Sequence, residues 1–124
     1  MAEAAGGSRA ELADLVARHE QAALAELATE TAGTPLCRLD ARAAHGAKYW
    51  EGVVAALAQI RRALRRADDD RTAAVLAEWA AQWGVKSPLP PAGAAPSWSA
   101  YREGGIAACA ALHEGFTPSS SEAR

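Results

Sequence analysis

Cysteine is scarce in this chain, and the patterns that usually mark a metal site are missing. Only two cysteines occur in 124 residues, Cys37 and Cys109. They are too few for a disulfide framework and do not fit the spacing of metal ligands. The three histidines, His19, His45 and His113, fall on separate predicted helices. No glutamate begins the Glu-x-x-His pattern of di-metal bundles. The sequence therefore predicts neither a metal nor a cofactor.

A large charge of one sign and a long hydrophobic run are missing as well. The formal net charge is -2, so no overall basic field would attract nucleic acid or a membrane surface. The longest apolar stretch, residues 104–112, is far shorter than the roughly 20 residues that span a bilayer. The N-terminus carries Glu3 where a signal peptide would be basic. We therefore expect a cytoplasmic protein without membrane contact, for which nucleic acid is a disfavoured partner.

Signatures of catalysis are absent in the same way. Neither cysteine has a histidine beside it in the sequence, although a Cys–His pair formed across the fold stays open. No glycine-rich phosphate loop follows a strand, because no segment has the pattern of a strand. The sequence therefore favours a non-catalytic protein over an enzyme.

Alanine, by contrast, makes up roughly a quarter of the chain, well above its usual share. Alanine is the best helix former but buries little surface, so helices form readily while a few large side chains must supply the core. Caps and apolar periodicity predict an all-α fold, a small four-helix bundle. Its helices are expected at residues 9–32, 35–66, 71–83 and 98–114.

Local signals place the ends of these helices. Ser8-x-x-Glu11 fits a capping box at the start of the first helix. The second helix could begin at Pro35 or at Ala41, since an N-cap candidate precedes each. Gly84 and Gly115 are expected to cap the third and fourth helices. Residues 8–116 are predicted to form one domain, with disordered ends at 1–7 and 117–124, and no internal repeat is evident.

Two glycine- or proline-rich features of the C-terminal half are unusual. Residues 86–97 are proline-rich and predict a crossover between the third and fourth helices, with a docking ligand for another protein as the alternative. Gly104 and Gly105 lie in the middle of the fourth helix, where each glycine is costly. We expect them to allow close packing against an alanine-rich face of another helix. A kink or a ligand contact is the alternative.

Four arginines end the second helix and could bind phosphate groups: Arg61, Arg62, Arg65 and Arg66. The neighbouring first and third helical segments are acidic, however. This pattern favours antiparallel pairing of the helices in sequence order and screening of the arginines, so we rank nucleic-acid binding low.

The second helix also carries a long apolar stripe. Its residues are Leu36, Leu39, Ala43, Gly46, Trp50, Val53, Leu57, Ile60 and Leu64. Adjacent helical residues point about 100° apart, so Tyr49 and Trp50 cannot share this stripe, and Val54 widens it again. One residue of each adjacent pair, Tyr49/Trp50 and Val53/Val54, must therefore face another helix, another subunit or a ligand.

The candidate binding face is therefore aromatic and apolar, and comprises Tyr49, Trp50, Val54, Trp98 and Tyr101. We predict a non-catalytic helical interaction or regulatory protein that forms a homodimer through this face. The alternative is a helical bundle that binds a small molecule in an aromatic pocket, as an accessory protein or small enzyme of a biosynthetic pathway.

Overall fold

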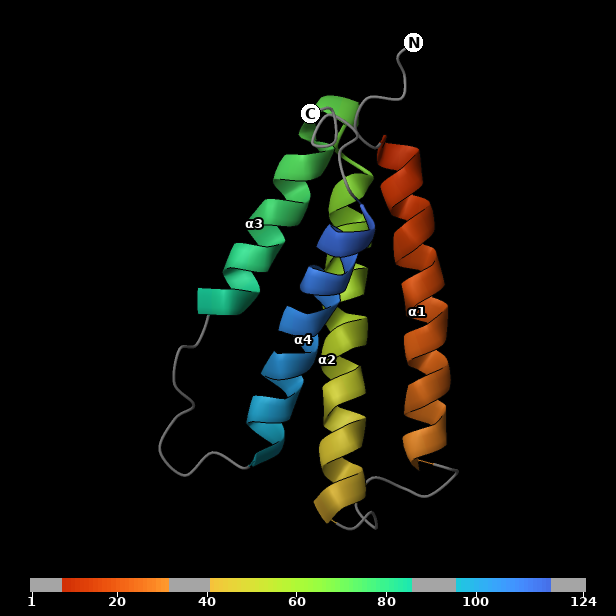
Figure 1. The fold of residues 1–124 in the computed structure, drawn as a ribbon, viewed down its shortest axis with the longest axis vertical. Coiled ribbons are helices and arrows are strands. Elements are labelled where there is room, and N and C mark those ends of the chain that lie inside the picture. Colours follow the sequence, from red (N-terminus) through yellow and green to blue (C-terminus); the bar gives the residue numbers. More distant parts are fainter. Residues whose placement is uncertain (1–7, 32–40, 86–95, 117–124) are drawn as a thin grey trace.

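The computed structural model describes residues 8–31, 41–85 and 96–116. These residues form four helices, α1 (Arg9–Thr31), α2 (Ala41–Leu64), α3 (Thr72–Val85) and α4 (Pro96–Gly115), with a 3-10 turn, η2 (Asp69–Arg71), before α3. None of the described residues lies in a strand, which confirms the predicted all-α bundle (Figure 1). The segments predicted to be disordered and most of the proline-rich crossover lie outside the described residues.

The two inner helices of the bundle are α2 and α4. They lie side by side and run in the same direction, while α1 flanks α2 and α3 flanks α4 (Figure 1). Each outer helix is antiparallel to the inner helix that follows it, so the chain forms two hairpins, α1–α2 and α3–α4. Helices α2 and α3 are antiparallel and in contact, as expected from the sequence, but α4 is the more extensive partner of α2.

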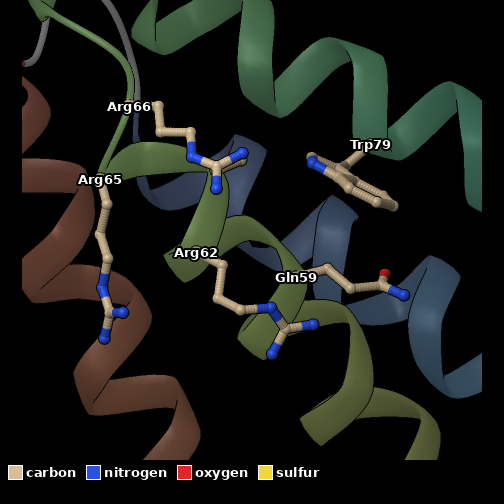
Figure 2. A pocket seen from close by; sticks show the side chains of 6 residues that line it. Gln59, Arg62, Arg65, Arg66 and Trp79 are labelled. Carbon is tan, nitrogen blue, oxygen red and sulfur yellow. The ribbon is translucent and has the colours of Figure 1, made fainter.

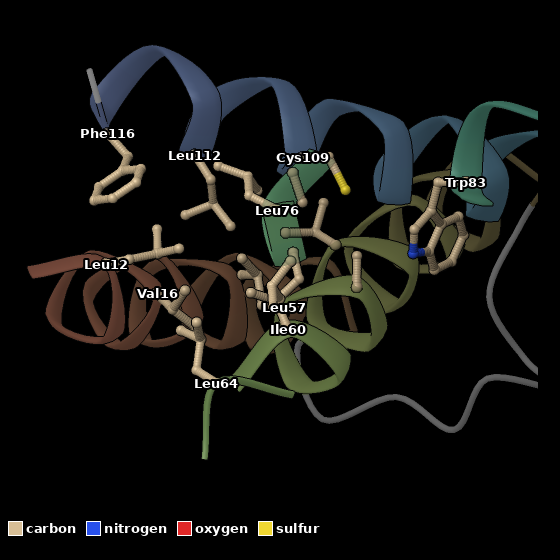
Figure 3. Close-up of a cluster of buried hydrophobic side chains, with 14 of the residues drawn as sticks. Leu12, Val16, Leu57, Ile60, Leu64, Leu76, Trp83, Cys109, Leu112 and Phe116 are labelled. Carbon is tan, nitrogen blue, oxygen red and sulfur yellow. The ribbon is translucent and has the colours of Figure 1, made fainter. Parts of the chain in front are cut away.

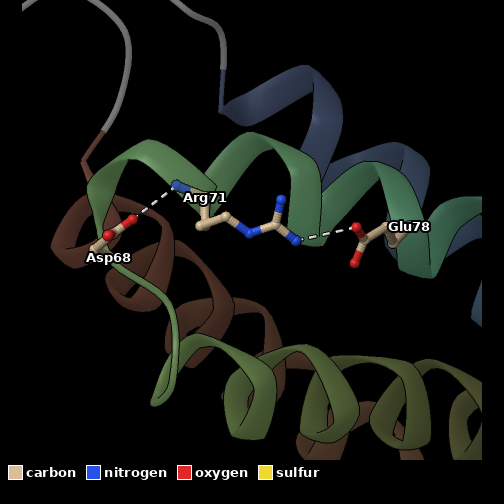
Figure 4. Close-up of polar contacts among 3 residues, drawn as sticks. All are labelled: Asp68, Arg71 and Glu78. Atoms are coloured by element: carbon tan, nitrogen blue, oxygen red, sulfur yellow. Dashed lines mark hydrogen bonds and ion pairs between the residues drawn. The ribbon is translucent and has the colours of Figure 1, made fainter.

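The predicted helix starts are largely confirmed. In the capping box, the Glu11 amide donates to Ser8 Oγ, and the Ser8 amide donates to a Glu11 carboxylate oxygen, both at 3.1 Å. The described part of α2 begins at Ala41, and the alternative start at Pro35 lies outside the described residues. Before α3, the Asp68 carboxylate accepts from the Arg71 amide at 3.1 Å and so caps the 3-10 turn (Figure 4).

The predicted helix ends need correction. Helix α2 ends at Leu64 rather than Arg66, because the Arg65 and Arg66 amides donate to carbonyl groups only three residues back, which makes a tighter turn. Gly84 is not a cap, since α3 continues to Val85 and Gly84 has no left-handed backbone. The Arg102 guanidinium on α4 donates to the Gly84 carbonyl at 3.0 Å, so another helix satisfies this carbonyl. Gly115 is likewise helical.

All four helices contribute to one core (Figure 3). The second-helix stripe is confirmed from Val53 to Leu64, where its large side chains are buried, while Leu36 and Leu39 lie outside the described residues. Ala80 of α3, by contrast, is exposed. The largest fully buried side chains are Leu12, Val16, Leu57, Ile60, Leu64, Thr72 and Leu112.

Two glycines set the crossing of α2 and α4. A Cβ atom on Gly52 would overlap the carbonyl group of Tyr101, and one on Gly104 would overlap the carbonyl group of Tyr49. The two backbones therefore approach so closely that neither position has room for a side chain. Close packing at Gly104 is confirmed, although its partner is the backbone of α2 rather than an alanine-rich face. The ring of Trp83 fills the equivalent space at Gly105.

The matching roles of Gly52 and Gly104 point to an internal repeat, which was not evident from helix periodicity and caps. Residues 49–60, YWEGVVAALAQI, match residues 101–112, YREGGIAACAAL, and residues 22–28, AALAELA, match residues 74–80, AVLAEWA. Alanine matches carry little weight in an alanine-rich chain, but the shared Tyr, Glu, Gly and Leu carry more. Both matches also have the same separation of 52 positions (49 to 101, and 22 to 74).

The two inner helices of the repeat share a pattern of buried positions, whereas on the outer helices Leu24 is exposed and its counterpart Leu76 is buried. Six buried residues of α2 have counterparts 52 positions later that are also buried. The α2 residues are Gly52, Val53, Ala56, Leu57, Ile60 and Leu64, and their counterparts are, in the same order, Gly104, Gly105, Ala108, Cys109, Leu112 and Phe116. The reciprocal contacts of the two Tyr-x-Glu-Gly segments show that the inner helices are related by an approximate twofold axis. The molecule is therefore built from two similar helical hairpins.

Candidate functional site

Two ring contacts involve residues of the predicted aromatic face. The rings of Tyr49 and Trp50 make an edge-to-face contact at 5.1 Å, whereas the ring of Tyr101 lies 5.6 Å from that of Trp83. Trp98 is in the first turn of α4, but its side chain lies outside the described residues. Tyr49 is thus paired with Trp50, and Tyr101 with Trp83.

The described side chains of this face are only partly exposed. Tyr49, Trp50, Val54 and Tyr101 are half-buried and pack against the core. Helix α4 lies directly on the segment of α2 that begins at Tyr49, because glycine at 52 and 104 lets it approach. Helix α4 is thus the partner of the α2 segment at Tyr49, Gly52 and Val53. Among the described residues, only Leu24 is a large apolar side chain with high exposure, at 52%.

A different apolar surface lies between α3 and α4. It is a groove of about 540 Å³ with a floor formed by Leu76 and Cys109, both nearly inaccessible to solvent. Exposed alanines and a half-buried isoleucine form its walls, and two polar residues lie at one end. The complete lining is Leu76, Ala77, Ala80, Ile106, Cys109, Ala110, His113 and Glu114.

The outer surface of α3 continues this apolar character. Its exposed positions include Ala73, Ala77, Ala80 and Ala81, and Glu78 is the only charged residue in the helix. The outer surface of α1, by comparison, carries several charged residues, among them Arg18 and Glu26. An ordinary solvent-facing helix resembles α1, so the charge-poor surface of α3 is the unusual one.

A second cavity lies where α2 ends beside α3. It has a volume of about 480 Å³, and its lining is Gln59, Arg62, Ala63, Arg65, Arg66 and Trp79. Figure 2 shows the Arg66 guanidinium facing the nitrogen edge of the Trp79 indole, with Arg62 and Gln59 on the same side of α2. Arg65 points away from Trp79.

The structure offers little support for metal or thiol chemistry within the described residues. No group of three or more possible metal-ligating side chains occurs there. Burial raises the pKa of the Cys109 thiol from 9.0 to about 11. The thiol is therefore protonated at neutral pH and is a poor nucleophile. Cys37 lies outside the described residues.

The sequence predicted only the arginines of the cavity beside α3, and it did not predict the α3–α4 groove. The sequence identified the four arginines, but it gave no sign that Trp79 of α3 lies beside them. The groove went unnoticed because alanine on a helix surface carries no distinctive signal. Periodicity alone also could not show that α3 has a nearly uncharged outer surface next to an open groove.

None of the described helices is both long and apolar enough to cross a membrane. Comparison of the whole chain with known proteins gives no relative from which a function could be inferred. No family model, no curated protein and no solved structure matches it.

Proposed function

We propose that this protein is a non-catalytic helical interaction protein that forms a homodimer through the α3–α4 groove. The observation that supports this proposal is the open apolar groove beside the charge-poor outer surface of α3. Apolar surface that remains open on a folded protein commonly marks a contact site. In this proposal the α3–α4 groove forms the dimer interface, in place of the face around Val54 that was predicted from the sequence.

A second copy of the chain is the occupant that fits this surface. An isologous dimer needs a surface that is complementary to itself, in which a ridge and a groove lie next to each other. Helix α3 provides a low ridge, because Ala77, Ala80 and Ala81 are small and exposed, and the groove lies along its edge. Each α3 can therefore enter the groove of the other copy, with close contact between helices.

The test is the oligomeric state of variants measured by sedimentation velocity at tens of micromolar. We expect the wild type to be a dimer, and Ala80→Lys or Ala110→Lys to be a monomer with unchanged helical content. Lysine is a good helix former, so the substitution places a charge in the interface without breaking the helix.

The repeat supplies a matched control. Ala28 on α1 is the counterpart of Ala80 and is also exposed on a helix. Ala28→Lys should therefore leave the dimer intact. A wild-type monomer, or equal dissociation by Ala28→Lys and Ala80→Lys, would refute the proposed interface. Val54→Lys tests the face predicted from the sequence, and dissociation by this variant alone would restore that face as the interface.

A further inference from the structure

The cavity at the end of α2, here called the arginine pocket, is lined mainly by side chains that donate hydrogen bonds. Arg62 and Arg66 have no acceptor atoms, and the indole of Trp79 has only its N–H group. Gln59 also carries an acceptor, but its Oε1 already accepts from the Trp83 indole at 3.0 Å. Gln59 can donate to a ligand in the pocket through its amide N–H groups. Such a lining is complementary to a ligand that is rich in acceptors and negatively charged.

The arginines of this pocket are not neutralised by carboxylates among the described residues. Arg61 forms an ion pair with Glu20 at 3.3 Å, but no ion pair within the described part of the chain involves Arg62, Arg65 or Arg66. Within the described residues, the screening expected from the sequence thus reaches Arg61 directly and not the other three.

The acidic turn after the arginines is engaged with backbone groups instead. The Asp68 carboxylate accepts from the Arg71 amide at 3.1 Å, and the Asp69 carboxylate accepts from the Arg9 amide at 2.8 Å. These bonds hold both carboxylates at the ends of neighbouring helices. Within the described residues, neither carboxylate forms an ion pair with Arg62, Arg65 or Arg66.

The repeat shows that the fold does not require this set of side chains. The counterparts of Gln59, Arg62 and Trp79 in the other copy are Ala111, Glu114 and Leu27. Helix α4 thus ends with an acidic residue where α2 has Arg62. Stabilisation of a helix C-terminus by basic residues consequently explains only part of the pattern. The arginine pocket is a specific difference between two otherwise similar hairpins.

We infer that the arginine pocket binds a small phosphorylated aromatic molecule of nucleotide type. Guanidinium groups match the geometry of phosphate oxygens, so Arg62 and Arg66 would bind the phosphate groups. The Trp79 ring would stack against the aromatic ring of the ligand, and the Gln59 amide would donate to a ring acceptor. The cavity of about 480 Å³ lies within the usual size range of small-molecule sites. It shares no lining residue with the α3–α4 groove.

Calorimetric titration at low salt with ADP, adenosine and inorganic phosphate tests this inference. We expect ADP to bind at least about tenfold more tightly than either part alone, because only ADP engages both the guanidinium groups and the ring. Arg62→Gln and Arg66→Gln should each weaken ADP binding by about tenfold or more. Both residues are exposed, so these variants should fold normally.

Two further variants separate the site from general charge effects. Arg18→Gln removes the same charge from an exposed position on α1 and should leave ADP affinity within about twofold of wild type. Trp79→Leu should reduce the advantage of ADP over phosphate, once circular dichroism has shown native helical content.

Several results would overturn the inference. They are the absence of ADP binding, an ADP affinity no greater than that of phosphate, and an affinity unaffected by Arg62→Gln and Arg66→Gln. A single-stranded oligonucleotide whose affinity rises with length through the same arginines would reassign the pocket to nucleic acid.

Discussion

Cys109 illustrates how its surroundings determine the chemistry of a single side chain. The residue is 2% exposed at the floor of the α3–α4 groove, and removal from water disfavours the thiolate. Its pKa rises from 9.0 to about 11 for that reason. A residue that might be suspected as a nucleophile from its type alone is therefore a small apolar core residue here.

This shift predicts a loss of stability at alkaline pH. Because the folded-state pKa of Cys109 is raised, its contribution to the free energy of unfolding is fully present below pH 9.0 and is lost as the pH rises through about 11. Relative to Cys109→Ala, the wild type should lose about 2–3 kcal/mol across this range. Urea unfolding of both proteins at a series of pH values measures the difference, in which the other titrating groups cancel. Parallel pH profiles would contradict the predicted burial.

At the scale of the helices, the α2–α4 crossing depends on two residues without side chains. Gly52→Ala or Gly104→Ala should lower the free energy of unfolding by about 1–3 kcal/mol, because the added methyl group must push two backbones apart. Gly84 provides the control, since a Cβ there would meet no atom within 4 Å. Gly84→Ala should leave the free energy of unfolding unchanged or raise it by up to about 1 kcal/mol, because alanine has the higher helix propensity.

Denaturant unfolding of Gly52→Ala, Gly104→Ala and Gly84→Ala measures their free energies of unfolding. Similar stabilities of Gly52→Ala and Gly84→Ala would show that the inner helices are farther apart than the structure places them. The two substitutions have the same effect on intrinsic helix propensity, so the difference between them reports the crossing alone.

The local parts of the fold could be predicted because their causes lie within a few residues of sequence. The Ser8–Glu11 capping box and the inward positions Leu12, Val16, Leu57 and Ile60 follow from side chains three or four residues apart. The choice of α4 as the main partner of α2 depends on contacts between positions such as 52 and 104. Helix periodicity contains no information about which faces meet.

The candidate sites were harder to predict for the same physical reason. A cavity is defined by the residues that line it from different helices, and the arginine pocket combines Arg62 of α2 with Trp79 of α3. The sequence identified the arginines and the widened stripe around Tyr49 and Val54. It could not show that α4 packs against α2 at Gly52 while Arg62, Arg65 and Arg66 stay exposed.

The whole molecule resembles a dimer of hairpins held in one chain. Each hairpin places an alanine-rich outer helix against an inner helix, and the inner helices meet at their Tyr-x-Glu-Gly segments. The two copies differ where the proposed functions lie, with the groove open on α3–α4 and the arginine pocket formed at the end of α2. A shared framework thus supports two distinct surfaces.

The reciprocal crossing of Gly52 and Gly104 has an evolutionary consequence. Duplication and fusion of a gene for one self-pairing hairpin would leave this pattern, in which each half contacts the other through the same motif. A peptide of residues 8–67 should then pair with itself, with Gly52 meeting the Tyr49 carbonyl of a second peptide. Analytical ultracentrifugation with circular dichroism should show a helical dimer that Gly52→Leu abolishes. A peptide that stays monomeric at high concentration would instead indicate that the ancestral hairpin never folded without a covalent partner.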